Sequence, residues 1–426
     1  MTPGPKISHV AQESTALQKI TSSGGMRRAF WSCQAIGLVL ITFSTFFPRL
    51  FHIQEYVFFI LLISALVVSW IDKYNPWVRT PLDLPLVCFS AWVLVTIPFA
   101  IDPTYSFGEW RKFIALTLVF YWALFVLRGE FIEHLPRYVL SAAVLGSMVL
   151  SSYALIDFLI RGGTWRDRFI RAGAPHSDYN WLTTYMVLVI PMLVAVCFVS
   201  RDRWLRFSAG LAVPLAILAQ MASYTRAGWV AHVAQGMTFG LLTGRRRLVL
   251  WIAGGTGSIL LLLTALSQVG FQRETINPLT LDQRLGTWKL GMEHIAAHPL
   301  VGVGYGNDTF TKLHPEYSIQ AQQGRRLQEQ VLPAMHNTFL MVAMGSGIPA
   351  VVLFLGVLVR MFSFLVKLRN STSHPESGGL LLGVAVVVVG FITRNTFDYM
   401  FTGSLASLFW ILLAIGFSTQ KRWPVG

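Results

Sequence analysis

Arginines recur where the apolar runs of the sequence end. A guanidinium stays charged at any physiological pH, and its rigid fork of donors fits the oxygens of a phosphate. Arg226 stands between two apolar runs, Arg284 lies on a later polar segment, and residues 161–171 carry four arginines, including Arg168 and Arg171. These side chains could hold a pyrophosphate at a membrane surface. Binding of anionic lipid headgroups is an alternative, and so is snorkelling of any single arginine.

His336 could supply a general base, because it lies with Asn337 directly before an apolar run. Histidine is the side chain best placed to accept a proton near neutral pH, for example from an attacking hydroxyl. A helix N-terminus at this point would disfavour the charged imidazolium and keep the ring neutral. A structural histidine bonded to a neighbouring carbonyl is the alternative, and for a lone histidine it is the commoner case.

No sequence pattern indicates metal or nucleotide chemistry. The glycines of 302–306 resemble a dinucleotide-binding loop superficially, but no strand precedes them and no helix follows, so we interpret them as a tight turn. Cys33, Cys88 and Cys197 all fall in apolar runs, which favours packing over disulfides or metal binding. CxxC, HExxH and Walker motifs are absent from the sequence. We therefore expect an activity without metal or other cofactor.

The composition predicts an all-α membrane protein. The chain has 426 residues, of which 54% are hydrophobic and 13% are charged, against about 25% charged in a typical soluble protein. The apolar runs have about the 20 residues that a transmembrane helix needs. They do not alternate with period two, as barrel strands would. The net charge of +14 is largely Lys and Arg beside these runs, so we expect no nucleic-acid partner.

We predict about twelve transmembrane helices and one large loop. The first apolar run lacks a cleavage site and is expected to remain as a helix. The expected organisation is nine helices in 1–267, a large loop at 268–337 and three helices in 338–426. The expected spans are 30–47, 56–71, 84–100, 113–127, 138–160, 180–199, 207–223, 228–243, 248–267, 338–359, 379–395 and 400–419.

The distribution of positive charge predicts the orientation. An even number of spans puts both termini on one side, and short cytoplasmic loops are enriched in Lys and Arg. With cytoplasmic termini, 19 of the 34 Lys and Arg lie inside. Six of the others fall in the long loop, which the rule discounts, so the comparison is 19 against 9. We expect cytoplasmic termini and a periplasmic loop.

The long loop is expected to contain amphipathic helices. An apolar stripe at helical spacing predicts the first, with Arg284 beside it, and the turn 298–307 ends it. A second polar helical stretch is expected at about 316–332, ending at Pro333. The stripe consists of Leu281, Leu285, Trp288, Met292 and Ile295.

Several short motifs occur in a characteristic order. Residues 165–400 resemble the O-antigen ligase and polymerase superfamily of bacterial envelope proteins, and the helix layout extends the resemblance over the chain. Thr225 departs from that pattern, because the family often has Ser before the motif's arginine. The motifs are Arg171-Ala-Gly-Ala-Pro-His-Ser-Asp-Tyr-Asn180, Thr225-Arg226-Ala-Gly-Trp229, Arg284-Leu-Gly-Thr-Trp288, His298-Pro-Leu-Val-Gly-Val-Gly304, His336-Asn-Thr-Phe-Leu340 and Gly345-Ser-Gly-Ile-Pro349.

The resemblance implies a metal-independent, inverting glycosyltransferase of lipopolysaccharide biosynthesis, multi-pass in the inner membrane with a periplasmic active site. It implies an undecaprenyl-diphosphate-linked O-antigen as donor and lipid A–core oligosaccharide as acceptor, amid membrane lipids. Arg226 and Arg284 match the family's functional arginines and His336 its functional histidine. Asp398, within Arg394-Asn-Thr-Phe-Asp398, matches an acidic position. Arg168 and Arg171 are further candidates for binding the substrate's phosphates.

Three other functions stay open. A polymerase of the same superfamily would extend the lipid-linked glycan, and a protein O-oligosaccharyltransferase would transfer it to a protein. A transporter of lipid or glycan would belong to another class. Transporters often have paired, interrupted helices in two related halves, whereas this chain has one oversized loop in its second half, which disfavours transport.

Overall fold

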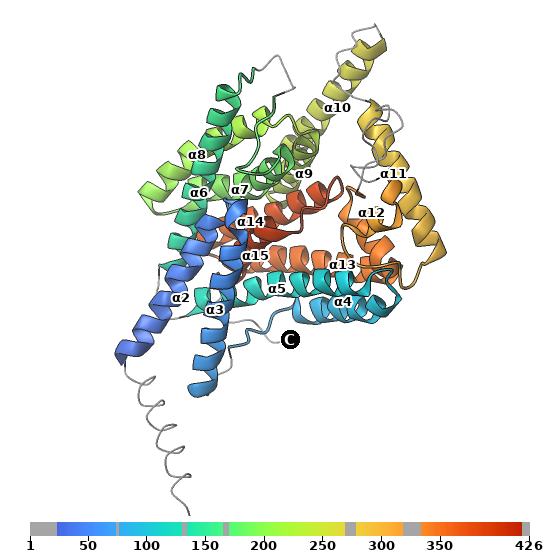
Figure 1. The fold of residues 1–426 in the computed structure, drawn as a ribbon. Helices are drawn as coiled ribbons and strands as arrows, with labels where there is room; N and C mark the ends of the chain where they lie inside the picture. Colours follow the sequence, from blue (N-terminus) through green and yellow to red (C-terminus); the bar gives the residue numbers. More distant parts are fainter. Residues whose placement is uncertain are drawn as a thin grey trace, which may run out of the picture.

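The structure is a computed structural model that describes residues 24–73, 76–129, 134–164, 170–268, 278–317 and 334–419. Within these ranges the regular elements are all helices, without a strand (Figure 1). Seven helical stretches of the described residues are long and apolar enough to cross a membrane, and two shorter helices are also apolar. The prediction of an all-α polytopic membrane protein is confirmed.

Each of the twelve predicted spans contains one helix. Most helices extend beyond the apolar run, because backbone hydrogen bonding continues outside the hydrocarbon; the tenth span ends twelve residues later than expected. The helices are α2 (Gly24–Ser44), α3 (Phe51–Ile71), α4 (Asp83–Thr96), α5 (Pro103–Arg128), α6 (Leu135–Ile160), α7 (Tyr179–Val199), α8 (Arg203–Ala222), α9 (Arg226–Leu242), α10 (Arg246–Gln268), α13 (Thr338–Ser371), α14 (Pro375–Asn395) and α15 (Gly403–Ser418).

The long loop contains the predicted first helix, α11 (Pro278–Ala297), and two short turns, α12 (Thr309–Leu313) and η3 (Pro315–Tyr317). The predicted apolar stripe is wrong in part, since Leu285 and Met292 are 49% and 54% exposed. The face that packs inward carries Thr287 and Gly291 instead, because these small residues let α11 approach Met335 closely. The second predicted stretch, 316–332 with Pro333, lies almost entirely outside the described residues.

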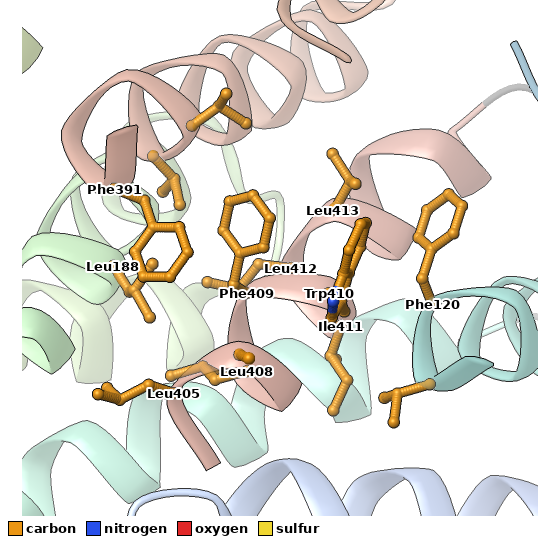
Figure 2. Packing of buried hydrophobic residues seen from close by; sticks show 14 of the residues in the cluster. Phe120, Leu188, Phe391, Leu405, Leu408, Phe409, Trp410, Ile411, Leu412 and Leu413 are labelled. Carbon is orange, nitrogen blue, oxygen red and sulfur yellow. The ribbon is translucent and has the colours of Figure 1, made fainter. Parts of the chain in front are cut away.

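The core is built around α15, which is buried along nearly its whole length. A helix that is hydrophobic on all sides belongs in the interior of a large assembly. Its Phe409 stacks on Phe391 of α14 with ring centroids 4.5 Å apart, and Trp410 packs against Phe120 of α5 (Figure 2). The segment between α14 and α15 is therefore held at both ends by buried helices.

Helix α13 is broken near its start, where Ser346 and Gly347 leave the helical conformation. The loop segment 299–304 lies across the break and pairs with it along the backbone. Unpaired backbone groups are tolerated at membrane depth only where protein surrounds them, and here α4 contributes as well, since Trp92 donates to the Ser346 carbonyl at 3.0 Å. The backbone bonds are Val303 N to Met344 O at 2.8 Å, Gly304 N to Gly345 O at 2.9 Å and Ile348 N to Pro299 O at 2.8 Å.

The glycines of 302–306 permit this close crossing. Gly302 has φ +66°, and a Cβ added there would lie 2.5 Å from the carbonyl of Gly345. Gly304 and Gly306 also have positive φ. The interpretation of this run as a tight turn agrees with the geometry, and the turn serves to bring loop and broken helix together.

Candidate functional site

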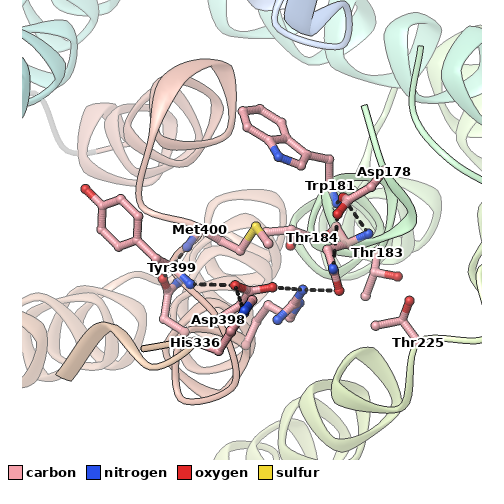
Figure 3. A network of polar contacts seen from close by, with 12 residues as sticks. Asp178, Trp181, Thr183, Thr184, Thr225, His336, Asp398, Tyr399 and Met400 are labelled. Atoms are coloured by element: carbon pink, nitrogen blue, oxygen red, sulfur yellow. Dashed lines mark hydrogen bonds and ion pairs between the residues drawn. The ribbon is translucent and has the colours of Figure 1, made fainter. Parts of the chain in front are cut away.

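A polar network lies at the N-terminus of α13 and joins three segments that are distant in sequence (Figure 3). His336 Nδ1 lies 2.9 Å from Asp398 Oδ1. The other carboxylate oxygen of Asp398 accepts from Arg394 Nη2 at 3.3 Å, and the same nitrogen reaches Asn180 Oδ1 at 3.1 Å. The network thus connects α7, the end of α14 and the residue before the cap of α13.

The local sequence explains why His336 points into this network. Asn337 is the N-cap of α13, because its side chain accepts from the backbone amides of Phe339 and Leu340 at 3.0 and 3.1 Å. His336 precedes this cap with φ +47°, so the chain turns sharply before the helix begins. Thr338 contacts the segment that contains Asp398, since its hydroxyl donates to the Asp398 carbonyl at 3.0 Å.

Asn180 is oriented by the cap of its own helix. Asp178 caps α7 by accepting from the backbone amides of Asn180 and Trp181. Its second carboxylate oxygen accepts from the Asn180 side-chain amide at 3.2 Å. The carbonyl oxygen of that side chain is therefore turned toward Arg394.

The electrostatics keep Asp398 ionised. Burial raises the pKa of Asp398, but the hydrogen bond from His336 and the charge of Arg394 outweigh it and hold the pKa below its ordinary value. An ionised carboxylate can only accept hydrogen bonds, so His336 donates through Nδ1. In the neutral ring the lone pair then resides on Nε2, and the His336 side chain is 24% exposed. This arrangement suits a histidine that takes up a proton while a carboxylate fixes its tautomer.

The sequence motifs contain Arg394 and Asn180 but assign neither a role, yet both belong to the network. The Arg394 side chain is fully buried. Its Nε and Nη1 have no hydrogen-bond partner among the described residues. The spacing of Arg394 and Asp398, four residues apart, could have indicated the pair.

Arg284 is brought to this site by α11. Trp288, one turn further along that helix, donates to the Met335 carbonyl at 2.8 Å and so fastens α11 to the residue before His336. Arg284 is half-buried and lies near enough to Arg394 for the two charges to repel. Of the predicted residues, the structure therefore groups His336, Asp398 and Arg284.

Arg226 and Arg171 lie at neighbouring helix ends. Arg226 is the first residue of α9 and is exposed. The first turn of α9 packs on α7, since a Cβ on Gly228 would lie 2.5 Å from Thr183. Arg171 stacks over Tyr179, the first residue of α7, at 4.5 Å. Arg168 lies outside the described residues.

Within the described ranges, no three His, Cys, Asp or Glu side chains gather as a metal site would require. The site is a histidine–carboxylate–arginine network with Arg284 beside it. It can accept a proton at His336 and offer positive charge to an anionic group. These features define a polytopic membrane protein with a proton-accepting, anion-attracting site at one end of its helices.

Residues 211–355 match the family model described as O-Antigen ligase. It is also similar to the "Exopolysaccharide production protein ExoQ" of Rhizobium meliloti (strain 1021), with 24% identity over 337 residues, covering 72% of each chain. The resemblance predicted from the motifs is confirmed. Both matches support a glycosyltransferase-like membrane enzyme of the ligase or polymerase type.

Proposed function

We propose that the protein is an inverting, metal-independent glycosyltransferase that ligates undecaprenyl-diphosphate-linked O-antigen to lipid A–core oligosaccharide at the periplasmic face of the inner membrane. The observation that carries the proposal is the contact of His336 with Asp398, beside Arg394 and Arg284. Diphosphate leaves readily once its charge is neutralised, so the protein needs positioning, positive charge and a base.

In the proposed reaction, the acceptor hydroxyl oxygen attacks the anomeric carbon of the donor sugar. Nε2 of His336 takes the hydroxyl proton while the bond from the anomeric carbon to the diphosphate oxygen breaks. The departing undecaprenyl diphosphate keeps the electron pair, and Arg226 and Arg284 stabilise its charge. A single displacement inverts the anomeric centre. The donor is already activated, so no nucleotide is consumed.

Asp398 and Arg394 act on the reaction through His336. The Asp398 carboxylate fixes the ring and stabilises the imidazolium that forms as the proton arrives. Arg394 in turn holds the carboxylate, and Asn180 holds the guanidinium. Both are positioning residues in this mechanism.

The test is a reconstituted reaction in liposomes with purified lipid-linked donor and lipid A–core acceptor. His336→Ala should lower the turnover rate by about 10²- to 10⁴-fold, as loss of a general base does, while the thermal melting temperature and donor binding persist. His298→Ala is the matched control, because His298 is an exposed histidine of the same long loop and lies outside the network. Loss of donor binding with an intact rate of transfer would contradict the role as base.

A polymerase is the second candidate, and the relative named for exopolysaccharide production favours it. Deletion strains distinguish the two functions through their lipopolysaccharide. Loss of a ligase leaves core without O-chains while lipid-linked polymer accumulates. Loss of a polymerase leaves at most one repeat on the core. If glycan is attached to protein in the wild type and not in the deletion strain, a protein O-oligosaccharyltransferase would be favoured instead.

A further inference from the structure

A large apolar cavity lies between α7, α8, α9 and α14, away from the network. Its volume is about 620 Å³, and its lining is predominantly apolar, with side chains such as Ile190, Val194, Phe198 and Leu382. It extends along α9 from Trp229 to Arg245, just past the helix's end. The thirteen residue steps of helix from Trp229 to Leu242 rise about 20 Å, so the far end of the cavity lies at the face of the bundle opposite His336.

That far end opens between basic side chains. Arg245 lines both the apolar cavity and an adjoining hollow formed by 244–248, which also contains Arg246 and Arg247. Gly379 and Leu382 likewise line both the cavity and a second hollow, which contains Arg369 and His374. The described residues lining these two hollows include no Asp or Glu.

The position of Arg245 distinguishes this place from an ordinary positively charged loop. Its guanidinium lies 5.9 Å from the ring centroid of Phe239, a residue that itself lines the cavity. Charges that only set the orientation of a membrane protein need no cavity. Here an arginine lies where an apolar cavity meets a basic surface. An anionic lipid has the complementary parts, an apolar acyl chain joined to a negatively charged headgroup.

We propose that this cavity binds an anionic glycerophospholipid from the leaflet opposite the His336 site. The phosphate would lie between Arg245, Arg246 and Arg369, and an acyl chain would occupy the apolar cavity. Basic pockets between transmembrane helices recognise lipid headgroups in this way. The proposal does not depend on the glycosyl transfer suggested for the opposite face.

The opposite end of the cavity would suit a different lipid, an isoprenoid phosphate. Gln220 lines that end near Gly228, and neither amide atom of its side chain has a hydrogen-bond partner among the described residues. An isoprenoid phosphate that entered beside Arg226 would meet Gln220 first. The experiment therefore compares the two lipids directly.

The test measures lipid binding to the full-length protein in neutral detergent by native mass spectrometry and by thermal shift. The probes are dioleoyl phosphatidylglycerol, dioleoyl phosphatidylcholine and undecaprenyl phosphate. Phosphatidylglycerol should bind and raise the melting temperature more than phosphatidylcholine. Arg245→Gln with Arg246→Gln should weaken it roughly 30-fold, since each arginine contributes about fivefold.

Two further variants make the result specific. Arg203→Gln with Arg206→Gln, both exposed in the first turn of α8 at the same face, should leave binding unchanged. Val194→Trp should weaken binding by filling the cavity while all arginines remain. Equal loss in both arginine pairs would overturn the proposal in favour of diffuse surface charge. Val194→Trp losing only undecaprenyl phosphate would overturn it in favour of an isoprenoid chain.

Discussion

Arg394 carries its charge into the protein interior, and the geometry around it shows why this is tolerated. Its side chain is fully buried, and Asp398 at 3.3 Å supplies the opposite charge. A buried ion pair contributes little by itself, but removing one partner leaves an uncompensated charge and costs about 3–5 kcal/mol. The site residues are therefore linked to the stability of the fold as well as to the reaction proposed for them.

Asp398→Asn should lower transfer about 10²- to 10⁴-fold. The amide cannot stabilise a protonated His336, and it can donate to Nδ1, which favours the wrong tautomer. Steady-state kinetics in liposomes measure the effect, with Asp308→Asn as control, because Asp308 lies outside the network. Near-normal turnover in Asp398→Asn would separate the carboxylate from the chemistry.

The same variant tests the charge state of Asp398. Its pKa in the folded protein is below the ordinary value of 3.8. Its ionised form therefore stabilises the fold fully above pH 3.8, and this contribution is lost as the pH falls through the lower folded-state pKa. The difference in unfolding free energy between wild type and Asp398→Asn should shrink below pH 3.8. A difference that is constant from pH 7 to pH 3 would contradict the assignment.

Arg226→Lys and Arg284→Lys should each abolish most transfer. Lysine keeps the charge but loses the planar fork that binds two phosphate oxygens together. Donor affinity, measured with radiolabelled lipid-linked glycan, should fall along with turnover. Arg206→Lys, at the opposite face, should behave as wild type. If both lysine variants remain active, the phosphate-binding role passes to Arg171 or Arg168.

At the scale of the helices, α11 marks the limit of prediction from sequence. Its existence follows from the local spacing of apolar residues, which is visible within twenty residues. The face that α11 buries cannot be predicted from local spacing, because contact with Met335 selects that face. It is built from Thr287 and Gly291. Likewise, nothing local relates His336 to Asp398 or Asn180, which meet through tertiary packing.

The crossing of 299–304 over broken α13 gives a prediction about stability. Gly302→Ala should destabilise the protein by about 1–3 kcal/mol, because alanine is strained at φ +66° and its Cβ would collide with Gly345. Thermal unfolding in detergent measures the change. Gly254→Ala on α10 is the control, since nothing lies within 4 Å of a Cβ added there. Equal melting temperatures for the two variants would show that the crossing adds little to stability.

At the scale of the whole molecule, the orientation in the membrane remains a prediction from charge. Single cysteines at His298 and Arg246, with Cys33, Cys88 and Cys197 replaced by serine, should differ in labelling by an impermeant maleimide in intact spheroplasts. The cysteine at 298 should react and the one at 246 should not. Equal labelling would contradict the assignment of the loop to the periplasm.

The order of the helices in the described residues could be predicted because a bilayer imposes one strong requirement on every span. Each span must be long, apolar and internally hydrogen-bonded, and this requirement is written locally in the sequence. How α5, α7, α14 and α15 surround one another depends instead on side-chain shapes such as those of Phe120, Phe391 and Trp410. Those contacts cannot be predicted from any local sequence pattern.

The buried position of α15 has a consequence for how the protein is made. Its neighbours α5, α7 and α14 are all translated before it. We expect the side chains that later enclose it, such as Phe120 and Phe391, to contact lipid until α15 is inserted. Insertion of α15 between them completes the core beside the segment that contains Asp398. We therefore expect the polar network to reach its final geometry once α15 has been inserted.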